Sequence, residues 1–138
     1  MNAVQVFQSR LHEIVRTGNP VGLEDLITDP FVLHTPRFLR PVTDRGHCLA
    51  ILKGILYLVP DIRYDRAWET DGSIAMEFKG HVRDTEILVH GLDIFTVGAD
   101  GRATELTVFL RPTKAIAALG ELEDAMVRQA TSGQKVSS

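Results

Sequence analysis

The feature that most limits the fold of this chain is a two-residue alternation of side chains over residues 74–83. The run IAMEFKGHVR has apolar residues or glycine at even positions and mostly charged residues at odd positions. Successive side chains of a strand point to opposite faces, so the run predicts a strand with one dry face. The turn pairs Asp71-Gly72 and Asp100-Gly101 favour hairpins in the same region. We therefore predict that the second half of the chain is a meander of antiparallel strands.

The first half of the chain has helical spacing instead. Apolar residues recur at three- and four-residue steps over residues 1–16 and cover a broad face of residues 45–58, which predicts two amphipathic helices. Shorter elements are expected around and after them: a helix over 23–27, a strand over 31–35, a loop between Pro36 and Pro41, and a closing helix over 113–127. This order predicts an α+β fold with helices first and a sheet second.

Length and composition indicate one domain, because 138 residues can bury about two thirds of the surface of the unfolded chain. We expect a single domain over residues 1–130 and a flexible polar tail over 131–138. The only cysteine, Cys48, excludes an internal disulfide, and no Cys/His cluster has zinc-type spacing, so no metal or cofactor is predicted.

Charge and hydropathy limit the partners. The net charge is −3 with dispersed Lys and Arg, which predicts no nucleic-acid partner. No segment approaches the ~20 apolar residues that span a bilayer, and the first residues lack a basic stretch followed by an apolar run. We therefore expect a cytoplasmic protein with no membrane partner.

Asp93 is the one acid in the otherwise apolar run Leu92-Asp93-Ile94-Phe95. If a hairpin tip lies at residues 83–84, even residues of the first strand share a face with odd residues of the next, and Asp93 joins Met76 and Phe78 on the dry face. Burial disfavours a carboxylate, so we predict a raised pKa and an acid able to donate a proton. The alternative is an acid that only holds the fold by accepting hydrogen bonds. A ligand-facing role is favoured because perturbed acids in clefts are enriched at functional sites.

Other residues of the predicted inner face suggest a ligand pocket. Gly80 and Gly91 predict a curved sheet that leaves space. Strand alternation places the side chain of Thr35 on the inner face, where it can position a polar group of a ligand. His34 is a further candidate, although the same alternation directs its side chain away from that face. We predict that a small hydrophobic ligand contacts the following residues: Leu11, Val15, Leu33, Met76, Phe78, Val89, Gly91, Phe95, Leu106, Val108 and Leu110.

The opposite, outer face is predicted to bear His81 and His90 beside Glu77 and Glu86. Cross-strand His–Glu pairs or dimer contacts are favoured there over a metal site, which needs convergent ligands with supporting partners. The outer face also has an apolar patch that predicts a homodimer: His90, Leu92, Ile94, Thr107 and Phe109.

The order of these elements resembles the nuclear-transport-factor-2-like superfamily, and most of all its bacterial SnoaL-like branch. The resemblance rests on a strand ending in His34-Thr35-Pro36 and a meander ending in DIFTVGADGRATELTVFLRP, and it covers about residues 4–119. It implies a cone-shaped α+β fold, in which a curved, largely antiparallel sheet wraps N-terminal helices around an apolar pocket. It also implies a short C-terminal helix and an outer sheet face that commonly dimerises.

Members of this superfamily include ketosteroid isomerase, limonene epoxide hydrolase, scytalone dehydratase, polyketide cyclases and proteins that only bind or associate. Asp93 falls on the position of the isomerase's protonated aspartic acid. The isomerase's general base corresponds to Thr35 and its first-helix tyrosine to Leu11, so steroid isomerisation is not expected.

The resemblance implies metal-free, cofactor-independent acid/base chemistry on a small hydrophobic metabolite, of the isomerase, dehydratase, cyclase or epoxide hydrolase type. No second acid is evident on the predicted inner face, and no base is evident beside Asp93. A non-catalytic carrier or sensor, or a dimerisation module, therefore stays open as an alternative function.

Overall fold

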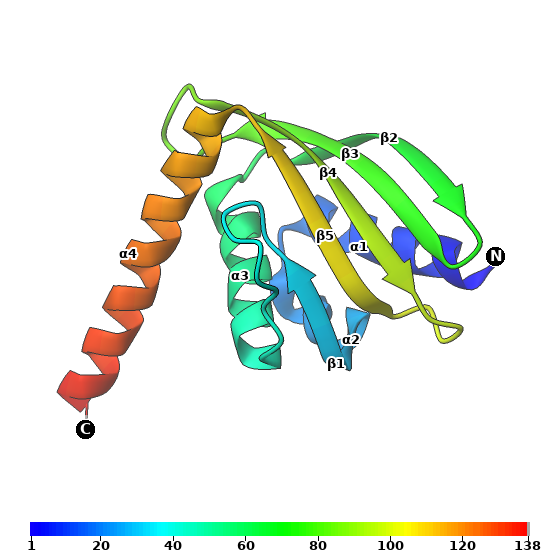
Figure 1. Ribbon diagram of the computed structural model, residues 1–138, viewed down its shortest axis with the longest axis horizontal. Coiled ribbons are helices and arrows are strands. Elements are labelled where there is room, and N and C mark those ends of the chain that lie inside the picture. Colours follow the sequence, from blue (N-terminus) through cyan, green and yellow to red (C-terminus); the bar gives the residue numbers. More distant parts are fainter. Residues whose placement is uncertain (138) are drawn as a thin grey trace.

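The computed structural model describes the backbone of residues 1–137 and the side chains of residues 1–126, 128 and 129. Helices lie on one side of a single curved sheet (Figure 1). In chain order the elements are α1 (Ala3–Thr17), η1 (Pro20–Gly22), α2 (Leu23–Leu26), β1 (Ile27–His34), α3 (Arg45–Leu58), β2 (Arg63–Thr70), β3 (Ser73–His81), β4 (Leu88–Val97), β5 (Ala103–Arg111) and α4 (Thr113–Ser137).

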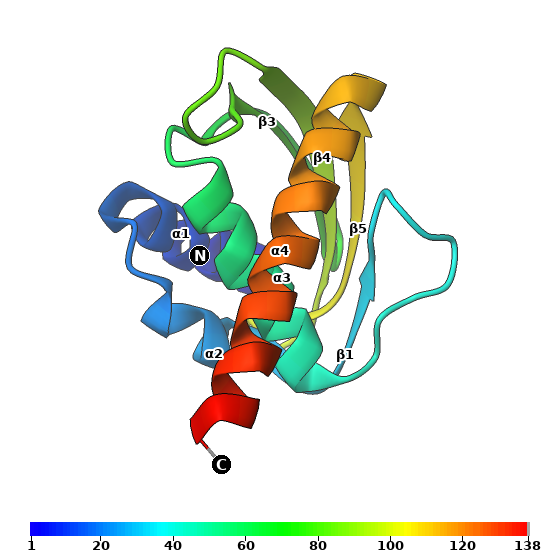
Figure 2. The ribbon, with the colours of Figure 1, turned by 90° about the vertical axis from the view of Figure 1, so that its left-hand side faces the viewer.

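The sheet has the strand order β1-β5-β4-β3-β2. β1 runs parallel to β5, while the pairs β5-β4, β4-β3 and β3-β2 are antiparallel. α1, α2 and α3 lie on the concave side of the sheet, and α4 leaves the end of β5 and passes beside α3 (Figures 1 and 2). The predicted α+β fold with a mixed sheet around N-terminal helices is confirmed.

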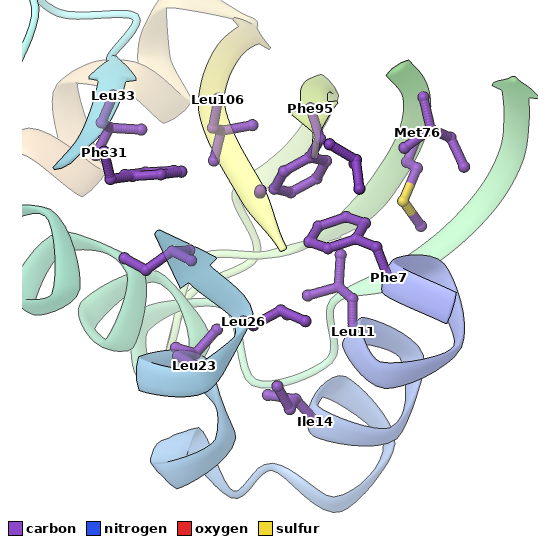
Figure 3. Close-up of a cluster of buried hydrophobic side chains, with 14 of the residues drawn as sticks. Phe7, Leu11, Ile14, Leu23, Leu26, Phe31, Leu33, Met76, Phe95 and Leu106 are labelled. Atoms are coloured by element: carbon purple, nitrogen blue, oxygen red, sulfur yellow. The ribbon is translucent and has the colours of Figure 1, made fainter. Parts of the chain in front are cut away.

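α1 shows how the sequence pattern becomes packing. Asn2 accepts a hydrogen bond from the backbone of Gln5 and forms a capping box with it, and Gly18 ends the helix at φ 70°, a conformation that favours glycine. The apolar stripe faces the sheet, and the ring of Phe7 lies 4.7 Å from that of Phe95 (Figure 3). Leu11 and its neighbours on the stripe are buried in the main core, as the spacing predicts.

α3 has the predicted bounds, Arg45–Leu58, and Asp44 caps it by accepting a hydrogen bond of 2.8 Å from the backbone N–H of His47. β1 begins earlier than residue 31, because Ile27 already pairs with Ala103 before an irregular stretch. The short second helix is correspondingly limited to Leu23–Leu26.

The register of β3 and β4 determines which way Asp93 points. Met76 lies opposite Asp93, and the last pair before the loop is His81 with Leu88. The loop is thus longer than a tip at residues 83–84 requires, but the pairing differs from the predicted one by an even number of residues. Parity is preserved, so Asp93 lies on the inner, concave face.

The two inner-face glycines do not leave space, so that prediction is wrong. A Cβ on Gly91 would lie 2.4 Å from the ring of Phe78 and 2.7 Å from Leu110, and a Cβ on Gly80 would lie 2.5 Å from Val59. Neighbouring side chains occupy the volume that each glycine vacates. The glycines therefore allow close packing against the strands and do not form part of a cavity.

α4 differs most from expectation. It runs to Ser137, so the prediction of a short helix ending near residue 127 is wrong. The backbone of 131–137 belongs to the helix; the flexibility predicted for 131–138 stays a prediction, and Ser138 lies outside the described residues.

Over residues 1–137, no helix is both long and apolar enough to cross a bilayer. The cytoplasmic location stays a prediction.

Candidate active site

A cavity of about 110 Å³ lies between the concave face of the sheet and the helices. Its walls come from α1, α2, α3, α4, the sheet, and the segments before β2 and after β1. Aliphatic and aromatic side chains make up most of the lining, and the polar exceptions are few: Thr35, Arg37, Tyr64, Asp93 and Glu123. A mainly apolar cavity with a few convergent polar groups is typical of a small-molecule site.

Asp93 is the acid that the sheet contributes to this lining, and its side chain is buried with a residue exposure of 7%. Its partner is Tyr64 of β2, whose hydroxyl donates a 2.8 Å hydrogen bond to Oδ2. Burial raises the pKa of Asp93 to about 7, and the hydrogen bond from Tyr64 opposes part of that rise. The acid is therefore partly protonated near neutral pH.

Over the part of the chain that the structure describes, Oδ1 of Asp93 has no hydrogen-bond partner and is available to a ligand. Tyr64 donates to Oδ2, and burial together with the neighbouring carboxyl raises the pKa of the Tyr64 hydroxyl well above its usual value. The phenol thus keeps its proton at any physiological pH and remains a donor. A proton on Oδ1 of Asp93 is then free to form a hydrogen bond with a ligand.

Sequence reasoning missed Tyr64 because β2 is irregular. Tyr64 pairs with Phe78 and Ala67 pairs with Met76, with a register shift between the two pairs, so an even and an odd residue of β2 share the inner face. Simple alternation cannot show this. The sequence feature that could have indicated Tyr64 is the apolar Ile62, which lies two residues before it and so points to the same face of a strand. Both side chains pack against a second buried cluster, which includes Val59, Phe78 and Val89.

Thr35 follows β1 at the outer part of the cavity, where sequence parity placed it. Its Oγ1 is buried and has no hydrogen-bond partner among the described residues. An unsatisfied buried hydroxyl costs free energy unless something else bonds it. Thr35 therefore offers a free polar group to a ligand or a bound water.

His34 does not line this cavity, in agreement with its strand parity, and its catalytic role stays a prediction. Its Nε2 lies 2.7 Å from a carboxylate oxygen of Glu105 on the other face of the paired strands β1 and β5. The physical reason is the strand parity that separates it from Thr35.

Most of the predicted lining residues do border the cavity: Leu11, Leu33, Phe78, Val89, Phe95, Leu106, Val108 and Leu110. Three do not. Met76 belongs to the main core and Val15 packs against its edge, while Gly91 is covered by its neighbours. Ligand contact by the eight that line the cavity stays a prediction.

The structure adds a second acid that the sequence did not reveal. Glu123 of α4 lines the cavity, and burial raises the pKa of its carboxyl although nearby Arg37 opposes the rise. The run Glu121 to Asp124 is typical of a solvated helix face. The signal that could have found Glu123 is its helical spacing from Ile116 and Leu119, two lining residues of the same helix.

The outer face holds a row of polar contacts. Arg66 donates two hydrogen bonds, of 2.8 and 2.9 Å, to the buried carboxylate of Glu77, and His90 lies 2.8 Å from the same group. These bonds, first from Arg66 and then from His90, lower the pKa of Glu77 to about 2. His81 pairs instead with Asp61 at 2.6 Å. Among the described residues no three metal-ligating side chains converge.

No family model matches the sequence, and the curated proteins contain no match either. Solved structures do match. A steroid delta-isomerase from Pseudomonas aeruginosa is 22% identical, with 96% of each chain covered and a TM-score of 0.86. An uncharacterised protein with a cystatin-like fold from Silicibacter pomeroyi is 24% identical over 94% of this chain and 90% of that chain, with a TM-score of 0.82.

A third similar structure is an NTF2-like protein of unknown function from Mesorhizobium loti, which is 19% identical over 80% of this chain and 92% of that chain, with a TM-score of 0.64. At such identities the likeness concerns the fold. Together with the mixed sheet, the concave cavity and the element order, it shows that the chain has the fold of the nuclear-transport-factor-2-like superfamily.

Proposed function

We propose that this protein binds a small hydrophobic metabolite in the cavity and performs metal-free acid/base chemistry on it, with Asp93 as the acid. The observation that best supports the proposal is a buried carboxyl, hydrogen-bonded by Tyr64, in an otherwise apolar cavity. A neutral acid in such surroundings can donate a hydrogen bond or a proton to a carbonyl or hydroxyl oxygen. Isomerase, dehydratase, cyclase and epoxide hydrolase reactions all use this step.

Cavity size favours a ligand no larger than about one ring. An apolar cavity of ~150 Å³ is known to hold benzene, and the volume here is about 110 Å³. A steroid has four fused rings and exceeds this volume. The likeness to a steroid delta-isomerase concerns the fold, and the family resemblance implies that Thr35 and Leu11 stand where two of the three groups of ketosteroid isomerase would lie.

The test is a panel of single-ring ketones, phenols and epoxides, with wild type compared to Asp93→Asn. Binding is followed by thermal shift and turnover by mass spectrometry. We expect turnover to be lost in Asp93→Asn while binding is retained within about tenfold, because the amide keeps the shape of the acid but cannot supply its proton.

The same panel separates this proposal from its alternatives. Binding without turnover in wild type identifies a carrier or sensor, which the almost wholly apolar lining also suits. If no compound shifts the melting temperature, ligand binding itself is refuted and a dimerisation module remains.

We further propose that the protein belongs to the SnoaL-like branch and forms a homodimer through the outer face of the sheet. On that face Phe109 is 57% exposed, and the half-buried Leu92 and Ile94 lie beside it on β4. Apolar side chains gathered on one sheet face are a typical basis for symmetric association.

A further inference from the structure

We propose that Glu123 of α4 is the general base of this site and acts on the ligand from the outer part of the cavity, while Asp93 acts from the inner part. The inference rests on the proposed function and names the group that sequence reasoning could not find, a base to work with the acid. It assigns α4 a catalytic role in addition to its packing role.

Placement on α4 supports the proposal. Ile116, Gly120 and Glu123 line the cavity and recur at four- and three-residue steps, so they share one face of the helix. α4 passes beside α3 (Figure 2). Asp93 lies on β4, opposite Met76. The two acids thus approach the same cavity from different elements.

The neighbouring charges leave Glu123 available. Arg37 forms two parallel hydrogen bonds of 3.1 Å with Asp124, and its nearest approach to Glu123 is 3.9 Å. No hydrogen bond to the Glu123 carboxylate is found among the described residues. The side chain of Glu123 is 20% exposed and that of Asp124 is 50% exposed. Arg37 is thus mainly the partner of Asp124, and Glu123 faces the cavity with free lone pairs.

Thr35 is close to this group. Thr35, Arg37 and Glu123 border both the main cavity and a shallow depression outside it, which places all three where the cavity approaches the surface. The unpartnered Oγ1 of Thr35 can hold a polar atom of the ligand beside the carboxylate. In this arrangement Thr35 positions the ligand and Glu123 moves the proton.

The chemistry balances without a co-reactant. For an enolisable ketone, Glu123 removes a proton from the carbon next to the carbonyl, and the electron pair of that C–H bond becomes the new carbon–carbon double bond. The carbonyl π pair moves to oxygen, where Asp93 stabilises the charge by a hydrogen bond or by transferring its proton. The protonated Glu123, whose side chain is 20% exposed, exchanges its proton with solvent and returns a solvent-derived proton to carbon, and Asp93 recovers its own proton.

A purely structural role is the competing explanation, in which Glu123 helps hold Arg37 against α4. That role belongs more to Asp124, which makes the short bonds to Arg37. Asp124→Asn is therefore a matched control: it neutralises the adjacent acid of the same helix and weakens the Arg37 contact, and Asp124 itself does not line the cavity.

The experiment measures deuterium exchange at the α-carbon of cyclohexanone and cyclohexenone in D₂O by proton NMR, for wild type, Glu123→Gln and Asp124→Asn. Ketone binding is measured in parallel by NMR titration. We expect wild type to accelerate exchange over buffer, Glu123→Gln to lose at least ~100-fold of that acceleration, and Asp124→Asn to stay within about threefold of wild type. Binding by Glu123→Gln is expected to remain within about threefold of wild type.

The possible failures are distinguishable. Equal exchange in wild type and Glu123→Gln, or an equal loss in both variants, overturns the role of Glu123 and leaves the proposed function intact. Ketone binding by wild type without accelerated exchange overturns Glu123 as a base and leaves a carrier. If neither ketone binds to wild type, the proposed function fails for carbonyl ligands and the role of Glu123 fails with it.

Discussion

At the scale of single residues, the site depends on how burial changes one carboxyl group. Asp93 is closed off from solvent by the sheet and helices, and among the described residues only Tyr64 forms a side-chain hydrogen bond with it that compensates for the lost hydration. Glu77 also has little exposed surface, but it lies on the outer face of the sheet, where bonds from Arg66 and His90 lower its pKa to about 2. Burial inside the cavity instead raises the pKa of Asp93 to about 7, because the bond from Tyr64 offsets only part of the lost hydration.

Stability should depend on pH through Asp93. The native state keeps the proton up to about pH 7, whereas the unfolded chain releases it near 3.8. Between these values the native state binds more protons, so the free energy of unfolding falls as pH rises, by up to ~4 kcal/mol, and then levels off above pH 7. Urea denaturation of wild type and Asp93→Asn at pH 5 and pH 8 measures this. The amide variant should lack this decline. An equal change in the free energy of unfolding between pH 5 and pH 8 in both proteins would contradict the buried-acid model.

Removing the hydroxyl of Tyr64 should raise the pKa of Asp93 further. The hydrogen bond from Tyr64 stabilises the ionised carboxylate, so Tyr64→Phe removes the contact that opposes the effect of burial on the pKa of Asp93. Carbon-13 NMR titration of the Asp93 carboxyl in both proteins gives the two values directly. Tyr57→Phe is a suitable control because the Tyr57 side chain is 53% exposed and lies outside the cavity lining. A pKa that falls in Tyr64→Phe would show that water replaces the phenol.

At the scale of elements, glycine allows side chains of neighbouring strands to pack directly against the backbone of the meander. Gly91 on β4 admits the ring of Phe78 and a side chain of β5 against the strand, and its added Cβ would also lie 2.6 Å from the carbonyl oxygen of Phe109. A backbone atom cannot move aside as a flexible side chain can. The face that sequence reasoning expected to be open is therefore one of the most tightly filled parts of the sheet.

Gly91→Ala should destabilise the fold by about 1–3 kcal/mol, because an extra methyl group is forced into a filled site. Gly46→Ala is the matched control. It lies exposed in the first turn of α3, where an added Cβ meets only Asp44 at 3.4 Å, and alanine is the better helix former. Chemical denaturation should show a large loss for the first variant and little change or a gain for the second. Equal effects would contradict the packing explanation.

At the scale of the whole molecule, the two faces of the sheet have different roles. The concave face and the helices enclose the cavity, while the convex face presents apolar residues of β4 and β5 to solvent. The proposed chemistry and the proposed dimer contact would thus lie on opposite sides of one layer of backbone. The proposed ligand would enter near Arg37, Thr35 and Glu123, which border both the cavity and the depression outside it.

Phe109→Glu should convert the proposed dimer into a monomer. A charge at this 57% exposed position has to be buried without a partner when two outer faces meet. Analytical ultracentrifugation of wild type and Phe109→Glu measures the change. Leu39→Glu, at a fully exposed apolar position in the loop after β1, controls for the effect of added charge alone. A wild type that sediments as a monomer would refute the proposed interface.

The sequence by itself determined the helices, the strands and the direction of Asp93, because these follow from periodicity along a short stretch of chain. Hydrophobic spacing located α1 and α3, and parity placed Asp93 inside even though the hairpin loop is longer than expected. The position of Thr35 at the cavity followed from the same parity.

Only the tertiary structure decided which side chains surround Asp93. Tyr64 reaches Asp93 because an irregularity in β2 turns it inward, Glu123 arrives from a helix at the far end of the chain, and Gly91 is filled by its neighbours. Each of these contacts joins residues from separate elements, and their meeting depends on how the strands pair and where α4 lies. Local periodicity contains no information about such distances, which is why the acid was predictable and its partners were not.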